Sequence, residues 1–136
     1  MSDSNSNKLH FSLVSPEREL FSGDVEHIVI DGADGQFGAL AQHAPVMSVV
    51  KAGIVKIIDG NNVSKMYVGG GIVDVTPIGV TILTQDAIDI ASVDLAAITQ
   101  EISALKEDVR DARDDEARND YLAKLTRLET IASAAA

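Results

Sequence analysis

Few residues of this 136-residue sequence are of the types that catalysis or metal binding requires. Cysteine is absent, which excludes thiol catalysis, disulfide bonds and cysteine-bound zinc. His10 and His27 each lie in a strand-like run without a second ligand two or four residues away, so neither predicts a metal site. His43 lies in an irregular stretch, as either a contact or a turn residue. No serine stands in the G-x-S-x-G pattern of a hydrolase. These residues indicate a binding or structural protein that is not an enzyme and needs no cofactor.

Three further motifs contain residues that ligand loops use, but their spacing differs. Gly69-Gly70-Gly71 lacks the Lys and the following helix of a phosphate loop, so we expect a bulge or a tight connection between strands. The segment Asp31-Gly32-Ala33-Asp34-Gly35 lacks the calcium-loop spacing and predicts a turn. Asp114-Asp115-Glu116 lies among arginines and predicts a solvated, charged bend.

The charge balance excludes several partners. Lys and Arg number 11 against 21 Asp and Glu, a net charge of −10. Such a surface disfavours binding to nucleic acid or to anionic lipid, because both require cations. No apolar run approaches the roughly 18 residues of a membrane span, and the first residues lack the apolar core of a secretory signal. We therefore expect neither nucleic-acid binding nor direct membrane insertion.

The composition changes near Ala91. All ten glycines and all three prolines precede this residue, and charged residues are about twice as dense after it. We predict an α+β protein with a disordered N-terminal tail (1–8), an antiparallel β-sandwich (9–91) and an antiparallel two-helix hairpin (92–136).

Short β-branched runs predict the strands of the first part. Asp59-Gly60-Asn61-Asn62 and Pro77-Ile78-Gly79 predict two hairpin turns between them. The expected strands are Leu9–Val14, Val25–Ile30, Val46–Val50, Ile54–Ile58, Val63–Val68, Ile72–Thr76 and Val80–Thr84.

The second part has the helical period. Ser92 is the predicted N-cap, with Asp94 in the first turn, and 110–120 predicts a polar bend. Each helix has one thin apolar seam, so the hairpin must lean on the sandwich or on a partner. The seam residues are Leu95, Ile98, Ile102, Leu105 and Val109, then Tyr121, Leu125, Leu128 and Ala132.

Two other readings remain open on these patterns alone. A free-standing β-sandwich binding module that dimerises through its helical hairpin explains the seams equally well. A small enzyme that uses His43 with a carboxylate has little support, because no acid–base partner can be placed.

Three motifs follow one another along the chain. They are Leu13-Val14-Ser15-Pro16-Glu17 with Leu20-Phe21-Ser22-Gly23, Gly35-Gln36-Phe37-Gly38 with His43-Ala44-Pro45, and Tyr67-Val68-Gly69-Gly70-Gly71-Ile72-Val73-Asp74-Val75. In this order they resemble the epsilon subunit of bacterial-type F1Fo ATP synthase. The resemblance is close over roughly residues 9–110 and extends to the remainder in layout.

This resemblance implies a sandwich of about ten strands and a non-catalytic rotor subunit that couples proton flow to ATP synthesis. It implies a gamma-subunit interface at Ser15, His43, Ala44 and Pro45, and a contact with the rotor-ring c subunits at Gly35, Gln36 and Phe37. The C-terminal helices would reach the α/β catalytic subunits and restrain ATP hydrolysis, weakly here because the second helix is acidic. The implied location is peripheral, on the cytoplasmic side of the bacterial inner membrane, with an organellar inner or thylakoid membrane as the alternative.

Some members of that family bind ATP at the start of the hairpin through an [IL]-D-x-x-R-A motif. The matching stretch here, 93–98, retains Asp94, but Ala97 stands where the Arg would be and Ile98 where the Ala would be. Each charge-assisted bond that is lost removes about 1.5–3 kcal/mol of binding. We therefore expect no nucleotide site.

Calorimetric titration of the isolated chain with ATP tests this expectation. The titration should detect no micromolar binding, because no guanidinium is available at position 97 to bond the phosphates. Micromolar affinity would contradict the prediction and would mean that other residues of the hairpin hold the nucleotide.

Overall fold

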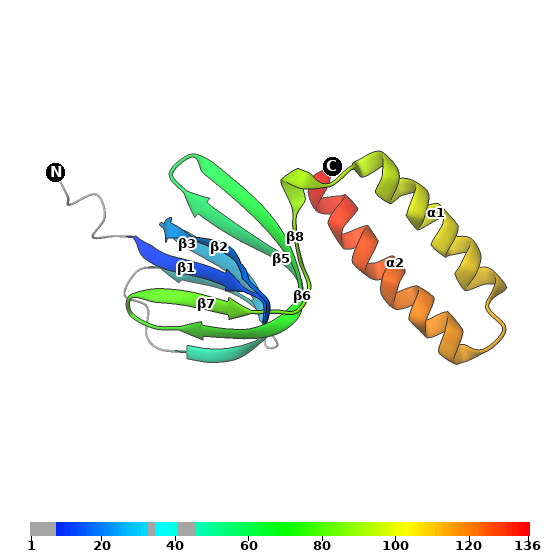
Figure 1. Cartoon of the computed structure of the whole chain (residues 1–136), viewed down its shortest axis with the longest axis horizontal. Coiled ribbons are helices and arrows are strands. Elements are labelled where there is room, and N and C mark those ends of the chain that lie inside the picture. The colour runs from blue at the N-terminus through cyan, green and yellow to red at the C-terminus, as the bar shows by residue number, and fades with distance from the viewer. Residues whose placement is uncertain (1–7, 33–34, 41–45) are drawn as a thin grey trace. The chain divides into compact units, whose positions relative to one another are not determined.

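The structure, a computed structural model, describes residues 8–32, 35–40 and 46–136, and the side chains of 8–30 and 47–136 (Figure 1). The chain divides into two compact units, the first ending at Asp89 and the second beginning at Ile90. The first contains all the described strands and the second contains the helices. The predicted tail, 1–8, falls outside the described residues except for Lys8.

Eight strands in the described part of the chain form one sheet in the order β2-β1-β7-β6-β5-β3-β4, with β8 paired to β6. The sheet is antiparallel except where β1 runs parallel to β7. It folds into β-sandwich-like layers (Figure 1) and confirms the predicted α+β class. The strands are β1 (Leu9–Val14), β2 (Glu19–Val25), β3 (His27–Gly32), β4 (Gly35–Leu40), β5 (Val46–Asp59), β6 (Asn62–Val75), β7 (Gly79–Leu83) and β8 (Ala87–Asp89).

The core follows from the two-residue alternation of each strand. In β1, Leu9, Phe11 and Leu13 are at most 1% exposed, while the residues between them face outward. The ring of Phe11 lies 5.6 Å from that of Phe21 on β2. Burial of such side chains is the main force that holds the sheet closed.

Strands β5 and β6 are longer than the sequence predicted. Each is one strand of 14 residues where two short strands were expected, so the described part of the chain has eight strands where the resemblance implied about ten. Pairing continues through the glycines, since Gly69 lies opposite Ala52 and Gly71 opposite Val50. Gly70 and Gly71 adopt φ of +98° and +153°. The three glycines therefore lie inside one bent strand. Of the two expected alternatives, a bulge or a tight connection between strands, the continuous strand excludes the connection.

Two aspartates define where the helices begin. The carboxylate of Asp94 accepts a hydrogen bond from the backbone N–H of Ala97 at 3.2 Å and caps α1 (Leu95–Asp111). The predicted cap, Ser92, is wrong because this residue lies in a short 3-10 helix, η2 (Ile90–Ser92). The carboxylate of Asp94 lies at the end of α1 where the first backbone N–H groups have no partner within the helix.

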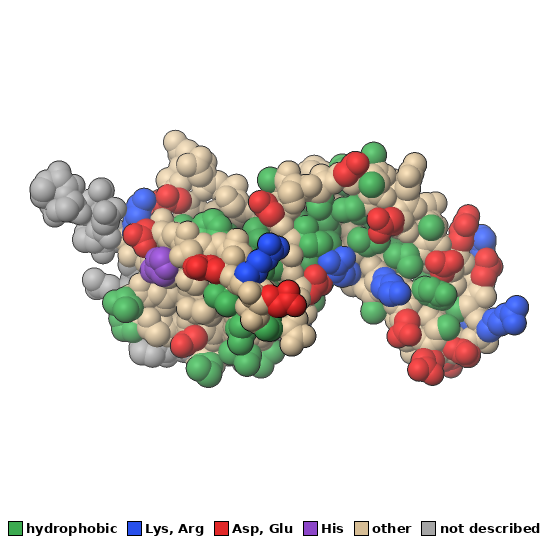
Figure 2. Space-filling model, viewed as in Figure 1, with side chains coloured by type: hydrophobic (Ala, Val, Ile, Leu, Met, Phe, Trp, Pro, Cys, Tyr) green, Lys and Arg blue, Asp and Glu red, His purple; other side chains and the backbone are tan. Residues whose placement is uncertain are grey.

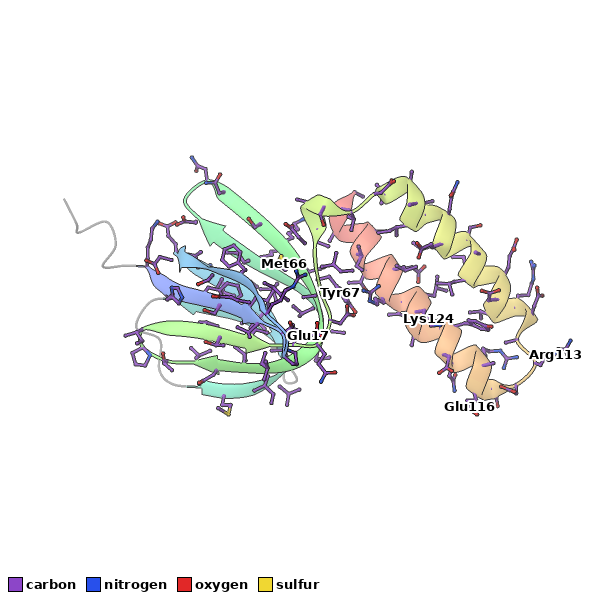
Figure 3. The ribbon with its side chains drawn as sticks, in the orientation of Figure 1. Glu17, Met66, Tyr67, Arg113, Glu116 and Lys124 are labelled. Carbon is purple, nitrogen blue, oxygen red and sulfur yellow. The ribbon has the colours of Figure 1, made fainter. Side chains whose placement is uncertain are left out.

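The polar bend predicted over 110–120 is confined to 112–114, and Asp114, Asp115 and Glu116 are exposed as expected. Asp114 caps α2 (Asp115–Ala135) by accepting from the N–H of Ala117 at 2.7 Å. Asp115 and Glu116 then occupy the first turn, where the helix dipole favours anions. Figure 3 shows Arg113 and Glu116 at the connection between the two helices. No helix in the described part of the chain is long and apolar enough to cross a membrane.

Replacing Gly71 with Ala should strongly destabilise the first unit. A Cβ at this position would collide with the carbonyl oxygen of Leu83, and φ there disfavours any side chain. We expect the free energy of unfolding in urea to fall by about 2 kcal/mol or more.

The matched control is Gly23→Ala on β2. A Cβ at Gly23 would meet only the ring of Phe21, at an ordinary 3.7 Å. Unfolding of this variant should change by less than about 0.5 kcal/mol. Equal effects of the two substitutions would show that the bend at Gly71 is not under steric constraint.

Candidate functional site

Three apolar side chains lie in register across the outer face of the sheet. Val49 of β5 is the Cα partner of Ile72 on β6, and Ile72 is the partner of Leu83 on β7. These side chains are 58%, 50% and 47% exposed. The residue beside each of them in its strand is buried, so the alternation of the strands directs all three outward.

The row continues onto a fourth strand. Val14 of β1 is the partner of Leu83 and is half-buried. We call Val14, Leu83, Ile72 and Val49 the apolar row. Met47, which is 72% exposed, lies two residues before Val49 on the same side of β5. Figure 2 shows hydrophobic side chains gathered on the surface of the sheet unit. Contiguous exposed apolar surface of this kind marks a contact with another molecule.

Ser15 follows directly after the Val14 end of the apolar row. Its hydroxyl donates to the carbonyl oxygen of Arg18 and accepts from the N–H of Arg18, both at 3.2 Å. The backbone N–H of Ser15 also donates to that carbonyl at 2.8 Å. These bonds close a turn of four residues, so the structure places Ser15 in an ordered turn beside the row.

The other residues predicted for interfaces lie elsewhere or outside the described part. Gly35, Gln36 and Phe37 lie on β4, which forms one edge of the sheet, and their backbones pair with 30–32 of β3. In the sheet order, four strands lie between β4 and β1. His43, Ala44 and Pro45 lie outside the described residues.

A polar cluster on β1 and β2 was not expected from the sequence. Nδ1 of His10 lies 3.0 Å from Oδ1 of Asp24, and its Nε2 lies 3.1 Å from Oγ of Ser22. The order Ser–His–Asp is that of a hydrolase triad, but the side chains of His10 and Asp24 are 54% and 61% exposed. A triad depends on a site from which water is excluded. We therefore assign the cluster to the pairing of the two strands.

Two further features concern metal binding and nucleotide binding. Among the described residues, no group of three or more His, Asp and Glu side chains is placed to hold a metal ion. The carboxylate of Asp94, the retained residue of the nucleotide motif, bonds to the N–H of Ala97. Asp94 thus has a structural role as a helix cap. The apolar row is the feature that sequence reasoning missed, and only the cross-strand register could have revealed it.

Comparison of the sequence with known families gives a match to ATP synthase, Delta/Epsilon chain, beta-sandwich domain, over residues 8–90. An ATP synthase epsilon chain of Maricaulis maris is 41% identical over 129 residues, which is 95% of this chain and 97% of that protein. One of Parvibaculum lavamentivorans is 42% identical over 125 residues, covering 91% of this chain and 95% of that protein.

Two solved assemblies contain chains of similar fold. A chain of the Euglena gracilis mitochondrial ATP synthase, in a structure of OSCP, F1 and c-ring, matches with a TM-score of 0.81. It covers 93% of this chain and 81% of its own, at 19% identity. A chain of the Tetrahymena thermophila central stalk and c-ring matches with a TM-score of 0.59 at 14% identity, covering 95% of this chain and 97% of its own. At these identities the similarity concerns the fold, a β-sandwich followed by helices.

Proposed function

The chain belongs to the ATP synthase delta/epsilon family, and on that basis we propose that it is the epsilon subunit of an ATP synthase. Relatives that carry this name match it over almost their whole length. In this role the chain is a non-catalytic part of the central stalk. It is peripheral to the membrane and couples rotation of the ring to ATP synthesis.

The apolar row is the observation that carries the proposed gamma interface. Burial of exposed apolar area releases roughly 25 cal/mol per Å², and a flat four-strand row presents that area without rearrangement. Ser15 adjoins one end of the row. His43, Ala44 and Pro45 precede β5, the strand that carries Val49 at the other end. We assign these four residues to the rim of the same contact.

The edge strand β4 supports a separate contact with the rotor-ring c subunits. Gly35, Gln36 and Phe37 lie on this strand, at the opposite end of the sheet order from β2. A rotor component must transmit torque without deforming. The continuous backbone pairing from β2 to β4 suits that load, because each strand is held by its neighbours over several residues.

The helical unit is the proposed regulatory tail. We propose that 9–91 carries the rotor contacts and that 92–136 can engage the α/β catalytic subunits. In the two helices, Ile98, Ile102 and Leu105 are half-buried, whereas Leu125 and Leu128 are buried. A thin seam of this kind opens at modest cost, which a tail that changes partners requires.

Placing a charge in the apolar row should weaken binding to the gamma subunit. Ile72→Lys puts an ammonium group at the centre of the row, where docking would have to desolvate it. We expect the dissociation constant for purified gamma to rise by about tenfold or more.

Asn61→Lys is the matched control. It adds the same charge at the exposed turn between β5 and β6, away from the row. Its affinity for gamma should stay within about twofold of the unchanged chain. If Ile72→Lys binds gamma as tightly as Asn61→Lys does, the apolar row is not the interface.

Truncation tests which unit binds gamma and which unit restrains ATP hydrolysis. A chain that ends at Ala91 should keep its β-type circular dichroism and bind gamma normally, because the row and Ser15 lie in the first unit. In the assembled enzyme it should still support ATP synthesis and should raise ATP hydrolysis only slightly. Loss of the β signal would show that the helices complete the sandwich core, and a large rise in hydrolysis would show a strong brake.

A further inference from the structure

A hollow of about 510 Å³ opens on the sheet unit beside the glycines of β6. It is lined by Pro16 and by residues 69–72 and 83–86. Ile72 and Leu83 also belong to the apolar row. The hollow and the row are therefore parts of one surface.

Hydrogen bonds hold the hollow in shape. Thr84 is 2% exposed, and its hydroxyl donates to the carbonyl oxygen of Gly70 at 2.6 Å. The N–H of Thr84 donates to the carbonyl of Val14 at 2.9 Å, and the N–H of Gly69 donates to the carbonyl of Asp86 at 2.7 Å. The segment 84–86 is thus tied to both β1 and β6. A preformed cavity costs little ordering when a ligand enters.

The chain itself cannot fill this space from the glycines that line it. A Cβ at Gly71 would collide with the carbonyl of Leu83, and one at Gly70 would lie 3.3 Å from the carbonyl oxygen of Val50. A partner that covers the row must then either fill the hollow or leave a void beneath it. Protein contacts are close-packed, and a void forfeits the dispersion contacts of its whole lining.

We propose that one aromatic side chain of the gamma subunit inserts into this hollow and anchors the two subunits. The proposal rests on the proposed function and specifies how that interface is held. Pro16, Ile72 and Leu83 give the hollow an apolar side, while Thr84, Gln85 and Asp86 give it a polar side, a mixed lining that suits the apolar ring and polar tip of Tyr or Trp. Aromatic residues in central pockets carry most of the energy of protein interfaces.

The surroundings of the hollow indicate basic residues beside that anchor. Glu19 is the partner of Val14, and Asp74 is the partner of Met47. Both carboxylates are exposed, and the exposed cations nearby are Lys51 on β5 and Arg18, which lies between Glu17 and Glu19 in the sequence. Figure 3 shows Glu17 in the β1–β2 connection, next to Pro16 in the sequence. Arg or Lys on gamma would complement the acidic residues at both ends of the row.

Filling the hollow from within tests the proposal. Gln85→Trp, made in the full chain, introduces the only tryptophan of the sequence, so its emission reports whether the indole has left water. A blue-shifted emission shows that the indole has left water. The affinity of this variant for purified gamma should then fall about tenfold or more, because the anchor is displaced. Asn61→Trp, which adds the same side chain at the exposed turn between β5 and β6, should bind within about twofold. Unchanged affinity of a blue-shifted Gln85→Trp overturns the proposal.

If the indole of Gln85→Trp stays in water, a second variant tests the proposal. Gln85→Cys provides the only thiol of the chain for a photoactivatable benzophenone label. Crosslinking to gamma within a few residues of one aromatic side chain, whose replacement by Ala lowers affinity about tenfold, upholds the anchor. Attachment elsewhere or no attachment overturns it.

The two proposals fail in different ways. If Ile72→Lys weakens binding while a filled hollow does not, the gamma interface stands and the anchor is wrong. If the unchanged chain does not bind gamma at all, the proposed function itself fails, and the anchor with it.

Discussion

The bend of β6 at Gly70 and Gly71 is the constraint on which the sheet unit depends. One edge of β6 pairs with β5 along nearly its whole length. The other edge is shared by two strands, β8 at 66–68 before the bend and β7 at 72–75 after it. A straight strand could not present its edge to both layers. The glycines make the turn without breaking the ladder, because no Cβ obstructs the carbonyl of Leu83.

The bend also produces the surface that we assign to recognition. Where β6 emerges from it, Ile72 faces outward between Val49 and Leu83. An outward position on a half-buried sheet is normally polar, as Asp74 and Thr81 are at the next outward pair of the same two strands. Departures from that pattern are expected at functional sites, where binding compensates for the exposed apolar area. The bend of β6 thus both requires glycine and produces the surface that we assign to recognition.

The helical unit is stabilised by interactions between residues that are close in the sequence. Asp94 and Asp114 cap the two helices, and Arg118 bonds Asp115 at 2.8 Å within the first turn of α2. These interactions join residues three positions apart, so they persist wherever the unit lies. The seams are narrow, and most seam residues of α1 are only half-buried. Local caps with thin packing give helices that keep their shape while their tertiary contacts remain replaceable.

The sequence by itself determined the fold class and the two hairpin turns, because glycine, proline and apolar periodicity act over a few residues. It also carried the motifs that identify the family. It misplaced the first helix cap and split β5 and β6, since Gly and Lys within a strand look like interruptions until a neighbour pairs with them. Only the tertiary structure brought Val14, Leu83, Ile72 and Val49 into one row and enclosed the hollow beside it. Those residues come from four strands, and their juxtaposition depends on cross-strand register, which no local pattern specifies.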